Sequence, residues 1–368
     1  MPVLKSCQIG DPVDQILTPA LVLDRAVFER NLLRLMQACE GVRVRPHAKS
    51  HKCPEIAKRQ MALGAVGICC QKLSEAMVFA QAGIDDILLT NQVVGKSKLA
   101  ALATLAQSIR LGVLVDDMAQ VHALAHAMAH QAQAVDVYIE VEVGGQRCGV
   151  LPVEVAGLAQ AIDTSPQLRF AGLHCYHGGA QHYREASARQ AAIHHASEVA
   201  RQCVALLAQA GIETPCVTGA GTGTFWYERD SGVYTELQPG SYALMDRDYA
   251  DNAATDSDIR FEHALFVYST VMSVSHAGFV VVDAGLKSFS VDSGMPSVDG
   301  ASGLTYVRAS DEHGVIATED AHRPELGQTI RLIPGHCDPT VNLYDELVVV
   351  DEGRVVDIWP ITARGASL

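Results

Sequence analysis

Between residues 42 and 245 the sequence alternates between short β-prone runs and helical patterns. The eight β-prone runs are at 42–45, 65–70, 86–90, 110–115, 135–143, 169–176, 216–219 and 238–245. Helical patterns lie between most of them, at 55–63, 74–82, 96–107, 118–131, 152–161 and 184–210. Eight such units predict an α/β fold, a (β/α)8 TIM barrel. A doubly wound open sheet is the competing arrangement, but the count of eight and the placement of polar motifs favour the barrel.

The pattern of the sequence changes at Phe261. Helical periodicity nearly vanishes, and β-prone runs follow at 265–271, 279–283, 329–333, 346–350 and 355–359, which predicts a separate β-domain. A polar linker is expected at 248–258. Near the start, Leu21-Val22-Leu23 reads as a strand, and Asp24 is placed to cap a helix that follows it. We draw the barrel at 21–249 and the β-domain at 1–20 and 250–368.

Composition narrows the function. With 48% apolar and 19% charged residues, the chain has enough apolar material for a packed core. A net charge of -14 argues against a nucleic-acid partner, which calls for a basic face. Residues 1–15 lack the apolar core of a signal peptide, no apolar run reaches membrane-spanning length, and the ten cysteines form no C-x-x-C pair. We therefore expect a cytoplasmic protein with no membrane partner and with buried, reduced thiols.

Lys49 lies in a cationic segment directly after the first β-prone run. The segment reads Arg45-Pro46-His47-Ala48-Lys49-Ser50-His51-Lys52. Crowding by like charges lowers the pKa of a lysine, and a lysine with a lowered pKa forms a Schiff base readily. The alternative interpretation is a solvated basic strand end that binds an anion.

Polar residues follow the predicted barrel strands, where barrel enzymes place their active sites. They are Lys49, Gln71, Asn91, Arg147, Tyr176, His177, Gly221-Thr222-Gly223 and Gly240-Ser241-Tyr242. The two Gly-rich turns follow the seventh and eighth strands, a common phosphate site in barrels, because glycines let backbone N–H groups approach closely. The alternative is a pair of ordinary tight turns.

Several segments in the same order resemble one family of enzymes. Pro46 to Lys52 fits the pattern Pro-His-x-Lys-x-His-Lys of the D-threonine aldolase and D-serine dehydratase group, which are fold type III (alanine-racemase-like) pyridoxal 5'-phosphate (PLP) enzymes. The resemblance covers nearly the whole chain, through Gly67–Lys72, Gly144–Val150, Gly219–Gly223, Gly240–Tyr242 and Pro334–Thr340. It implies that the N-terminal strand joins the β-domain and that the protein is a homodimer.

The resemblance also implies roles for individual residues. Lys49 would carry PLP, and Arg147 would hydrogen-bond the phenolic oxygen of the cofactor. Tyr176 would lie against the pyridine ring or its nitrogen, and Gln71 is a weaker candidate for a ring or phosphate contact. The phosphate would be bound by Gly221, Thr222, Gly223, Gly240, Ser241 and Tyr242. The alternatives are a rim salt bridge for Arg147 and a core-lining role for Tyr176.

A possible metal motif occurs near the C-terminus, at His336-Cys337-Asp338. In an extended segment residues i and i+2 share a face, so His336 and Asp338 would converge on one ion while Cys337 points away. Imidazole and carboxylate suit Mn²⁺, with Mg²⁺ or Co²⁺ as alternatives. In the family, aspartate at this position is typical of aldolases and cysteine of zinc-dependent dehydratases. From two residues alone, a His–Asp hydrogen bond in a loop is the simpler interpretation.

The predicted activity is the PLP- and metal-dependent cleavage of 3-hydroxy-D-amino acids, of the D-threonine type, into glycine and an aldehyde. A hydroxide held by the ion or His177 would act as the base. The nearest alternatives are a 3-hydroxy-D-aspartate aldolase and a dehydratase that converts D-serine or 3-hydroxy-D-aspartate to a 2-oxo acid and ammonia. A racemase would leave the metal motif without a role. A non-catalytic PLP carrier would resemble the barrel alone.

Overall fold

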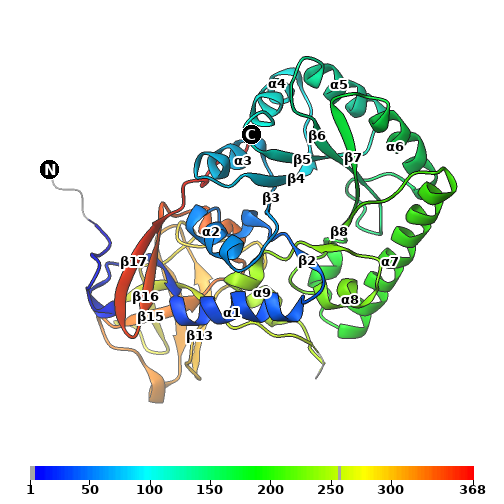
Figure 1. Cartoon of the computed structure of the whole chain (residues 1–368). Helices are drawn as coiled ribbons and strands as arrows, with labels where there is room; N and C mark the ends of the chain where they lie inside the picture. The colour runs from blue at the N-terminus through cyan, green and yellow to red at the C-terminus, as the bar shows by residue number, and fades with distance from the viewer. Residues whose placement is uncertain (1–4, 256–257) are drawn as a thin grey trace.

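The first of two β-sheets is a barrel of eight parallel strands (Figure 1). The structure is a computed structural model that describes residues 5–255 and 258–368. The barrel order is β2-β9-β8-β7-β6-β5-β4-β3. A backbone bridge between His47 and Cys69, with the N–H of Val66 donating to the carbonyl of Val44, joins the two ends. The strands are β2 (Arg43–Val44), β3 (Ile68–Cys70), β4 (Asp86–Gln92), β5 (Arg110–Val115), β6 (Val135–Glu140), β7 (Leu168–Cys175), β8 (Val217–Gly219) and β9 (Glu236–Leu237).

Helices surround the barrel strands, as the predicted (β/α)8 pattern requires (Figure 1). Pro54 opens α2 at a position where its missing N–H costs nothing, and the Asp117 side chain caps α5 by accepting the N–H of Ala119. The helices are α2 (Pro54–Ala62), α3 (Leu73–Gln81), α4 (Lys96–Leu105), α5 (Met118–Met128), α6 (Val155–Asp163), α7 (Ala186–Gln209), α8 (Phe225–Asp230) and α9 (Arg247–Ala250). The barrel predicted from the sequence is therefore confirmed.

The eighth strand differs from the prediction. It lies at Glu236–Leu237 and not at 238–245. A proline cannot extend a ladder, and here Pro239 lacks the N–H that the next pairing would need, so the strand ends before it. Residues Ser241–Ala243 form a single 3-10 turn, η5, in place of the predicted strand.

The second sheet has nine strands and forms the β-domain. Its path is β13-β14-β11-β10-β1-β16-β17, with β15 pairing to β10 and β12. The predicted runs correspond to β10 (Leu265–Ser273), β11 (Phe279–Val282), β15 (Thr329–Ile333), β16 (Glu346–Asp351) and β17 (Arg354–Pro360). Sequence analysis missed β12 (Ser297–Val298), β13 (Leu304–Ala309) and β14 (Gly314–Thr318). In β13 only Tyr306 is fully buried, so this strand lies mostly at the surface.

The N-terminal strand β1 (Ala20–Asp24) lies in this second sheet, antiparallel to β10 and parallel to β16. The boundary therefore falls after Asp24 and not at residue 21, because the ladder holds the whole strand in the β-domain. The Asp24 side chain accepts the N–H of Val27 and caps α1 (Arg25–Ala38), as predicted. At the other boundary, α9 occupies the start of the linker expected at 248–258. Residues 256 and 257 of that linker lie outside the described residues, and so do residues 1–4 of the expected β-domain.

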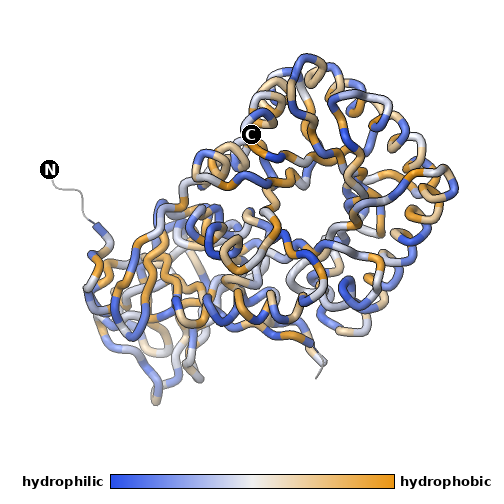
Figure 2. The backbone as a smooth tube through the Cα atoms, viewed as in Figure 1, coloured by the Kyte–Doolittle hydropathy of each residue, from blue (hydrophilic) through white to orange (hydrophobic). Residues whose placement is uncertain are grey.

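One continuous apolar cluster joins the barrel and the β-domain. It includes Leu89 and Val137 of the barrel, Phe28 of α1, and Leu265 and Leu347 of the β-domain. Figure 2 shows apolar segments along the barrel strands and through the β-domain. Shared burial of this kind fixes the two domains relative to each other. Among the described residues, none of the helices combines the length and apolar character that crossing a bilayer would require.

Candidate active site

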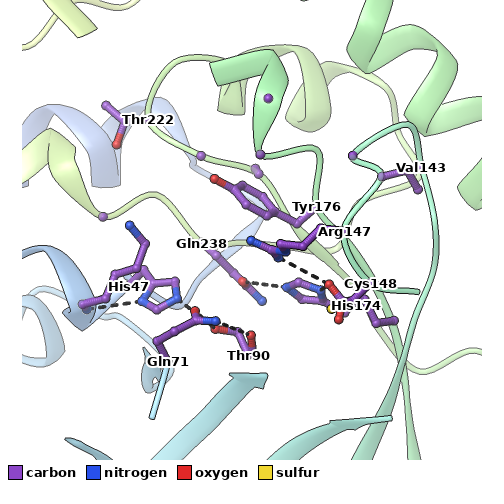
Figure 3. Close-up of a pocket in the computed structure, with 18 of the residues that line it drawn as sticks. His47, Gln71, Thr90, Val143, Arg147, Cys148, His174, Tyr176, Thr222 and Gln238 are labelled. Atoms are coloured by element: carbon purple, nitrogen blue, oxygen red, sulfur yellow. Dashed lines mark hydrogen bonds and ion pairs between the residues drawn. The ribbon is translucent and has the colours of Figure 1, made fainter. Parts of the chain in front are cut away.

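A cavity of about 350 Å³ opens at the carboxyl ends of the barrel strands (Figure 3). Eight of the residues predicted from the sequence line it: Lys49, Gln71, Arg147, Tyr176, Gly221, Thr222, Gly240 and Ser241. Six predicted residues are not among the lining residues: Asn91, His177, Gly223, Tyr242, His336 and Asp338. Asp338 nevertheless borders the cavity, because its carboxylate contacts Lys49 and Ser241.

Lys49 projects from a 3-10 turn, η2 (Ala48–Ser50), directly after β2. Its Nζ forms an ion pair with Oδ2 of Asp338, which belongs to the β-domain. Burial by itself lowers the pKa of the Lys49 amine, but the facing carboxylate outweighs burial and the net effect is a raised pKa. The lowered pKa predicted from the sequence for Lys49 is therefore wrong.

The cationic residues next to Lys49 in the sequence do not crowd its amine in the folded protein. Arg45 is buried and pairs with Glu236 at 3.0 Å and Asp86 at 2.5 Å. Lys52 pairs with Glu75 at 3.1 Å. Burial lowers the pKa of His51 to about 4, so this imidazole is neutral at neutral pH. Carboxylates from other barrel strands and from α3 thus neutralise Arg45 and Lys52, which flank Lys49 in the sequence.

The Gly-rich turn after β8 presents donors to the cavity. The hydroxyl oxygen of Thr222 accepts the N–H of Tyr242 at 3.0 Å, which leaves the Thr222 proton free to donate. Within the described residues, the backbone N–H groups of Gly221, Thr222 and Ser241 have no acceptor. Buried N–H groups without acceptors are rare in folded proteins, so this set is suited to a phosphate. The chemistry of the donors therefore fits PLP.

Gly223 does not contribute to this set. Its N–H donates to Oε1 of Gln181 at 3.0 Å, on the side away from the cavity. The side chain of Tyr242 also lies elsewhere, because its hydroxyl accepts from Gln60 at 3.0 Å in the core. The predicted phosphate contacts of Gly223 and of the Tyr242 side chain do not agree with these positions.

Arg147 and Tyr176 lie side by side in the cavity (Figure 3). The Arg147 guanidinium is 5.7 Å from the centre of the Tyr176 ring and 3.5 Å from Oε1 of Glu140. Burial raises the pKa of the Tyr176 hydroxyl, so the phenol is neutral at neutral pH. Arg147 thus makes the rim salt bridge considered as the alternative while it still faces the cavity.

Sequence analysis missed several residues on the cavity wall. His47 contacts Thr90 at 2.8 Å, and the Thr90 hydroxyl donates to Gln71 at 3.2 Å. His174 contacts Gln238 at 3.3 Å (Figure 3). His47 belongs to the lysine segment, so that motif carried a signal for it. The others follow or lie within β-strands as single polar residues, which no motif distinguishes.

His336 and Asp338 approach each other as predicted, but for a different reason. His336 precedes α10 (Cys337–Val341), a short helix, where an extended segment was expected. Pro339 falls in the first turn of that helix, where an N–H is not needed. His336 Nε2 is 4.0 Å from Asp338 Oδ1. Cys337 does not point away, since its Sγ lies 3.3 Å from that same oxygen.

The donor set around His336 suits a divalent ion. His336 Nδ1 contacts Oδ2 of Asp292 at 2.7 Å, so Nε2 is the nitrogen that faces Asp338. A ligand histidine that is oriented by a carboxylate through its other nitrogen is the usual arrangement in metal sites. The residues present therefore fit the predicted metal.

A second cluster, Asp116, Glu140 and Cys148, brings its ligand atoms within 4.8 Å of one another. Glu140 is already bound by Arg147 and by the amide of Gln92. The Arg147 cation occupies the position beside the carboxylate that a metal ion would need, so this cluster is a weaker metal site than His336 and Asp338.

His177 is held outside the cavity. Its Nδ1 accepts the N–H of Ala180 at 3.2 Å, and its ring contacts Tyr183 edge-on. Burial lowers the pKa of His177, so the imidazole is neutral. The position of the side chain does not match the role of base predicted for it from the sequence.

Comparison with known proteins agrees with this geometry. Residues 23–248, more than half of the chain, match the family model described as alanine racemase, N-terminal domain. The chain belongs to the alanine racemase N-terminal domain family. Residues 264–350 match a second model, described as a serine dehydratase domain. The two matches fall on the barrel and on the β-domain.

Three relatives of this alanine racemase-type chain cover nearly its whole length. It is 50% identical to a D-threonine aldolase of Arthrobacter sp, over 98% of this chain and 96% of that one. It is 40% identical to a 3-hydroxy-D-aspartate aldolase of Paracoccus denitrificans, over 97% and 94%. The crystal structure of D-threonine aldolase from Filomicrobium marinum superposes with a TM-score of 0.96 at 48% identity, over 99% and 100%.

Proposed function

We propose that the protein is a PLP- and divalent-metal-dependent lyase that cleaves 3-hydroxy-D-amino acids of the D-threonine type into glycine and an aldehyde. The observation that carries the proposal is the contact between Lys49, at the end of a barrel strand, and Asp338, on the β-domain. This contact supports the proposal, because it would bring a cofactor-binding amine next to a metal ligand. The 50% identity to a D-threonine aldolase supports the choice of reaction.

Different cavity residues would bind different parts of the cofactor. Lys49 would hold the aldehyde end of PLP, and Gly221, Thr222, Gly240 and Ser241, which also line the cavity, would bind its phosphate. When bound, PLP supplies an electron sink for the pair released from the breaking Cα–Cβ bond.

The cavity wall orients the other end of the cofactor. Arg147 would hydrogen-bond the phenolic oxygen, and the neutral hydroxyl of the adjacent Tyr176 would lie toward the ring. A neutral phenol leaves the ring nitrogen less electron-demanding than a carboxylate partner would, which restrains side reactions at Cα. Gln71 is held by Thr90 on the wall next to His47.

His336 and Asp338 would hold the divalent ion, with Mn²⁺ preferred and Mg²⁺ or Co²⁺ as alternatives. The ion would supply Lewis acidity that favours loss of the proton from the β-hydroxyl of the substrate. Asp292 orients His336, and Ser241 contacts Asp338 at 3.3 Å. The ligand pair therefore lies at the edge of the cavity, beside the amine that positions Cα.

The direct test is a product assay on the purified protein with PLP, MnCl2 and D-threonine. The proposal predicts glycine and acetaldehyde in equal amounts, with loss of turnover after chelation and recovery with Mn²⁺. Ammonia and 2-oxobutyrate would instead identify the dehydratase, and absence of both product pairs with D-threonine and with 3-hydroxy-D-aspartate would contradict a lyase.

The 3-hydroxy-D-aspartate aldolase is the second candidate, because a relative of that activity is 40% identical. Comparing the kcat/KM for D-threonine and 3-hydroxy-D-aspartate in one preparation separates the two. We also propose a homodimer, which light scattering tests, and a cytoplasmic location. Ten free thiols among the described residues support a reducing compartment.

A further inference from the structure

Behind the Gly-rich turn lies a buried side chain that the proposed chemistry does not use. Gln181, in the 3-10 turn η4 (Gly179–His182), is fully buried. Its Oε1 accepts the N–H of Gly223 at 3.0 Å, and its Nε2 donates to Oγ1 of Thr224 at 2.7 Å. Because the N–H of Gly223 can only donate, the orientation of the Gln181 amide is fixed.

The hydrogen bonds continue from the turn into the next helix. The Thr224 hydroxyl donates to Oε1 of Glu228 at 2.8 Å, and both residues are buried. Burial raises the pKa of Glu228 to about 8, so its carboxyl group is neutral at neutral pH. Gln181, Thr224 and Glu228 thus connect η4, the Gly-rich turn and α8 in one chain of hydrogen bonds that never enters the cavity.

Gln181 also explains both glycines of the turn. A Cβ on Gly221 would lie 2.5 Å from Oε1 of Gln181, and a Cβ on Gly223 would lie 2.9 Å from the Gln181 carbonyl oxygen. Any other residue would push the turn away from Gln181 and into the cavity. The glycine pattern that suggested close approach to a phosphate is required on the opposite side as well, by close approach to this glutamine.

We infer that Gln181 is the positioning residue of the phosphate turn. It anchors the turn from behind through the N–H of Gly223, and this leaves Thr222 and the N–H groups of Gly221 and Thr222 directed at the cavity. Gln181 itself is not among the residues that line the cavity. The inference rests on the proposed function, since the ligand of the turn is the phosphate of PLP.

Pyridoxal, which lacks the phosphate, provides the discriminating probe. The affinities of the metal-loaded protein for PLP and for pyridoxal are measured by absorbance titration in the wild type and in Gln181→Met, which keeps the chain length but loses the amide. We expect PLP affinity to fall on the order of tenfold, the effect of one displaced hydrogen-bond partner, with pyridoxal affinity unchanged. An unchanged ratio of the two affinities, whether both fall together or neither falls, would overturn the inference.

A second pair of variants covers the case in which Gln181→Met does not fold. Thr224→Val removes the hydroxyl that holds the Gln181 amide, and Thr224→Ser retains it. We expect a smaller loss of PLP affinity in the first, again without a change for pyridoxal, and a wild-type ratio in the second. Equal ratios in the two variants would overturn the inference.

The wild-type titration separates this inference from the proposed function. A wild-type protein that binds neither ligand, or binds both equally, contradicts the phosphate site itself and with it the proposed function. A wild-type protein that prefers PLP, combined with variants that keep the same preference, contradicts the role of Gln181 alone.

Discussion

Lys49 and Asp338 form an ion pair across the boundary between the barrel and the β-domain. They are brought together because α10 packs against η2, the turn that carries Lys49. Neither domain contains both groups, so an active site that needs the amine and the metal needs both domains. This relationship also argues against a non-catalytic PLP carrier, which would require the barrel alone.

The first prediction concerns the Lys49 amine. Lys49→Ala should abolish activity and the visible absorption of the lysine-bound cofactor, because no other amine among the described cavity residues replaces it. Spectrophotometric titration with PLP measures this directly. Lys58→Ala, an exposed lysine on α2, serves as the control and should behave as wild type. Turnover by Lys49→Ala would show that Lys49 is not the residue that binds the cofactor.

Substitution of the carboxylate should separate metal from cofactor. Asp338→Ala should lose activation by Mn²⁺ and nearly all turnover, and it should keep the absorption of bound PLP, because Thr222 and the Gly-rich turn remain intact. Activity as a function of metal concentration, recorded with the spectrum, tests this. Asp345→Ala, on the same domain and exposed, is the matched control. Collapse of the cofactor spectrum would show that Asp338 is structural.

Asp292 should increase the Mn²⁺ affinity of the site without being a metal ligand itself. It accepts from Nδ1 of His336 at 2.7 Å and so keeps Nε2 available as the ligand nitrogen. Asp292→Asn should weaken Mn²⁺ binding by roughly 10- to 100-fold, the usual effect of removing such a partner. Isothermal titration with Mn²⁺ gives the affinity. An unchanged affinity would mean that Asp292 does not orient the ligand.

Glu228 should make stability fall as pH rises. Its folded pKa is raised from 4.5 to about 8 by burial, so the folded protein keeps a proton that the unfolded chain loses above about pH 4.5. Between those values the free energy of unfolding decreases with pH, by about 1.4 kcal/mol for each unit of pKa shift. Glu228→Gln removes this contribution.

Urea unfolding at pH 5 and pH 8 measures the effect of Glu228. The stability of Glu228→Gln relative to wild type should rise between the two pH values by a few kcal/mol, on the order of 3. A difference between the two proteins that is independent of pH would contradict a neutral Glu228 in the fold.

Regular elements were predictable where a strand is a continuous apolar run. β5 and β15 have the bounds expected from the sequence, since each is a β-prone run followed by a residue unfavourable in strands, Asp116 or Pro334. β9 was misplaced because a two-residue strand gives almost no pattern, and apolar Tyr242 and Leu244 beyond Pro239 imitate one. Short or exposed strands therefore limit prediction from patterns.

The site was predictable to the extent that its residues form motifs. Lys49 and the turns around Thr222 and Ser241 were found because their neighbours in the sequence are also their neighbours in the cavity. The raised pKa of Lys49 could not be predicted, because it depends on Asp338, which is distant in the sequence and reverses the effect of the neighbouring cations. Gln181 was missed for the same reason: its partners Gly223 and Thr224 come from another turn.

The most direct test of the central claim is to locate the amine that carries the cofactor. The protein is loaded with PLP, reduced with borohydride to fix the cofactor on its amine, digested, and mapped by mass spectrometry. The account predicts a single modified residue, Lys49, in the wild type, and none in Lys49→Ala. Stoichiometric modification of another lysine, or of none in a protein that cleaves D-threonine, would contradict the account.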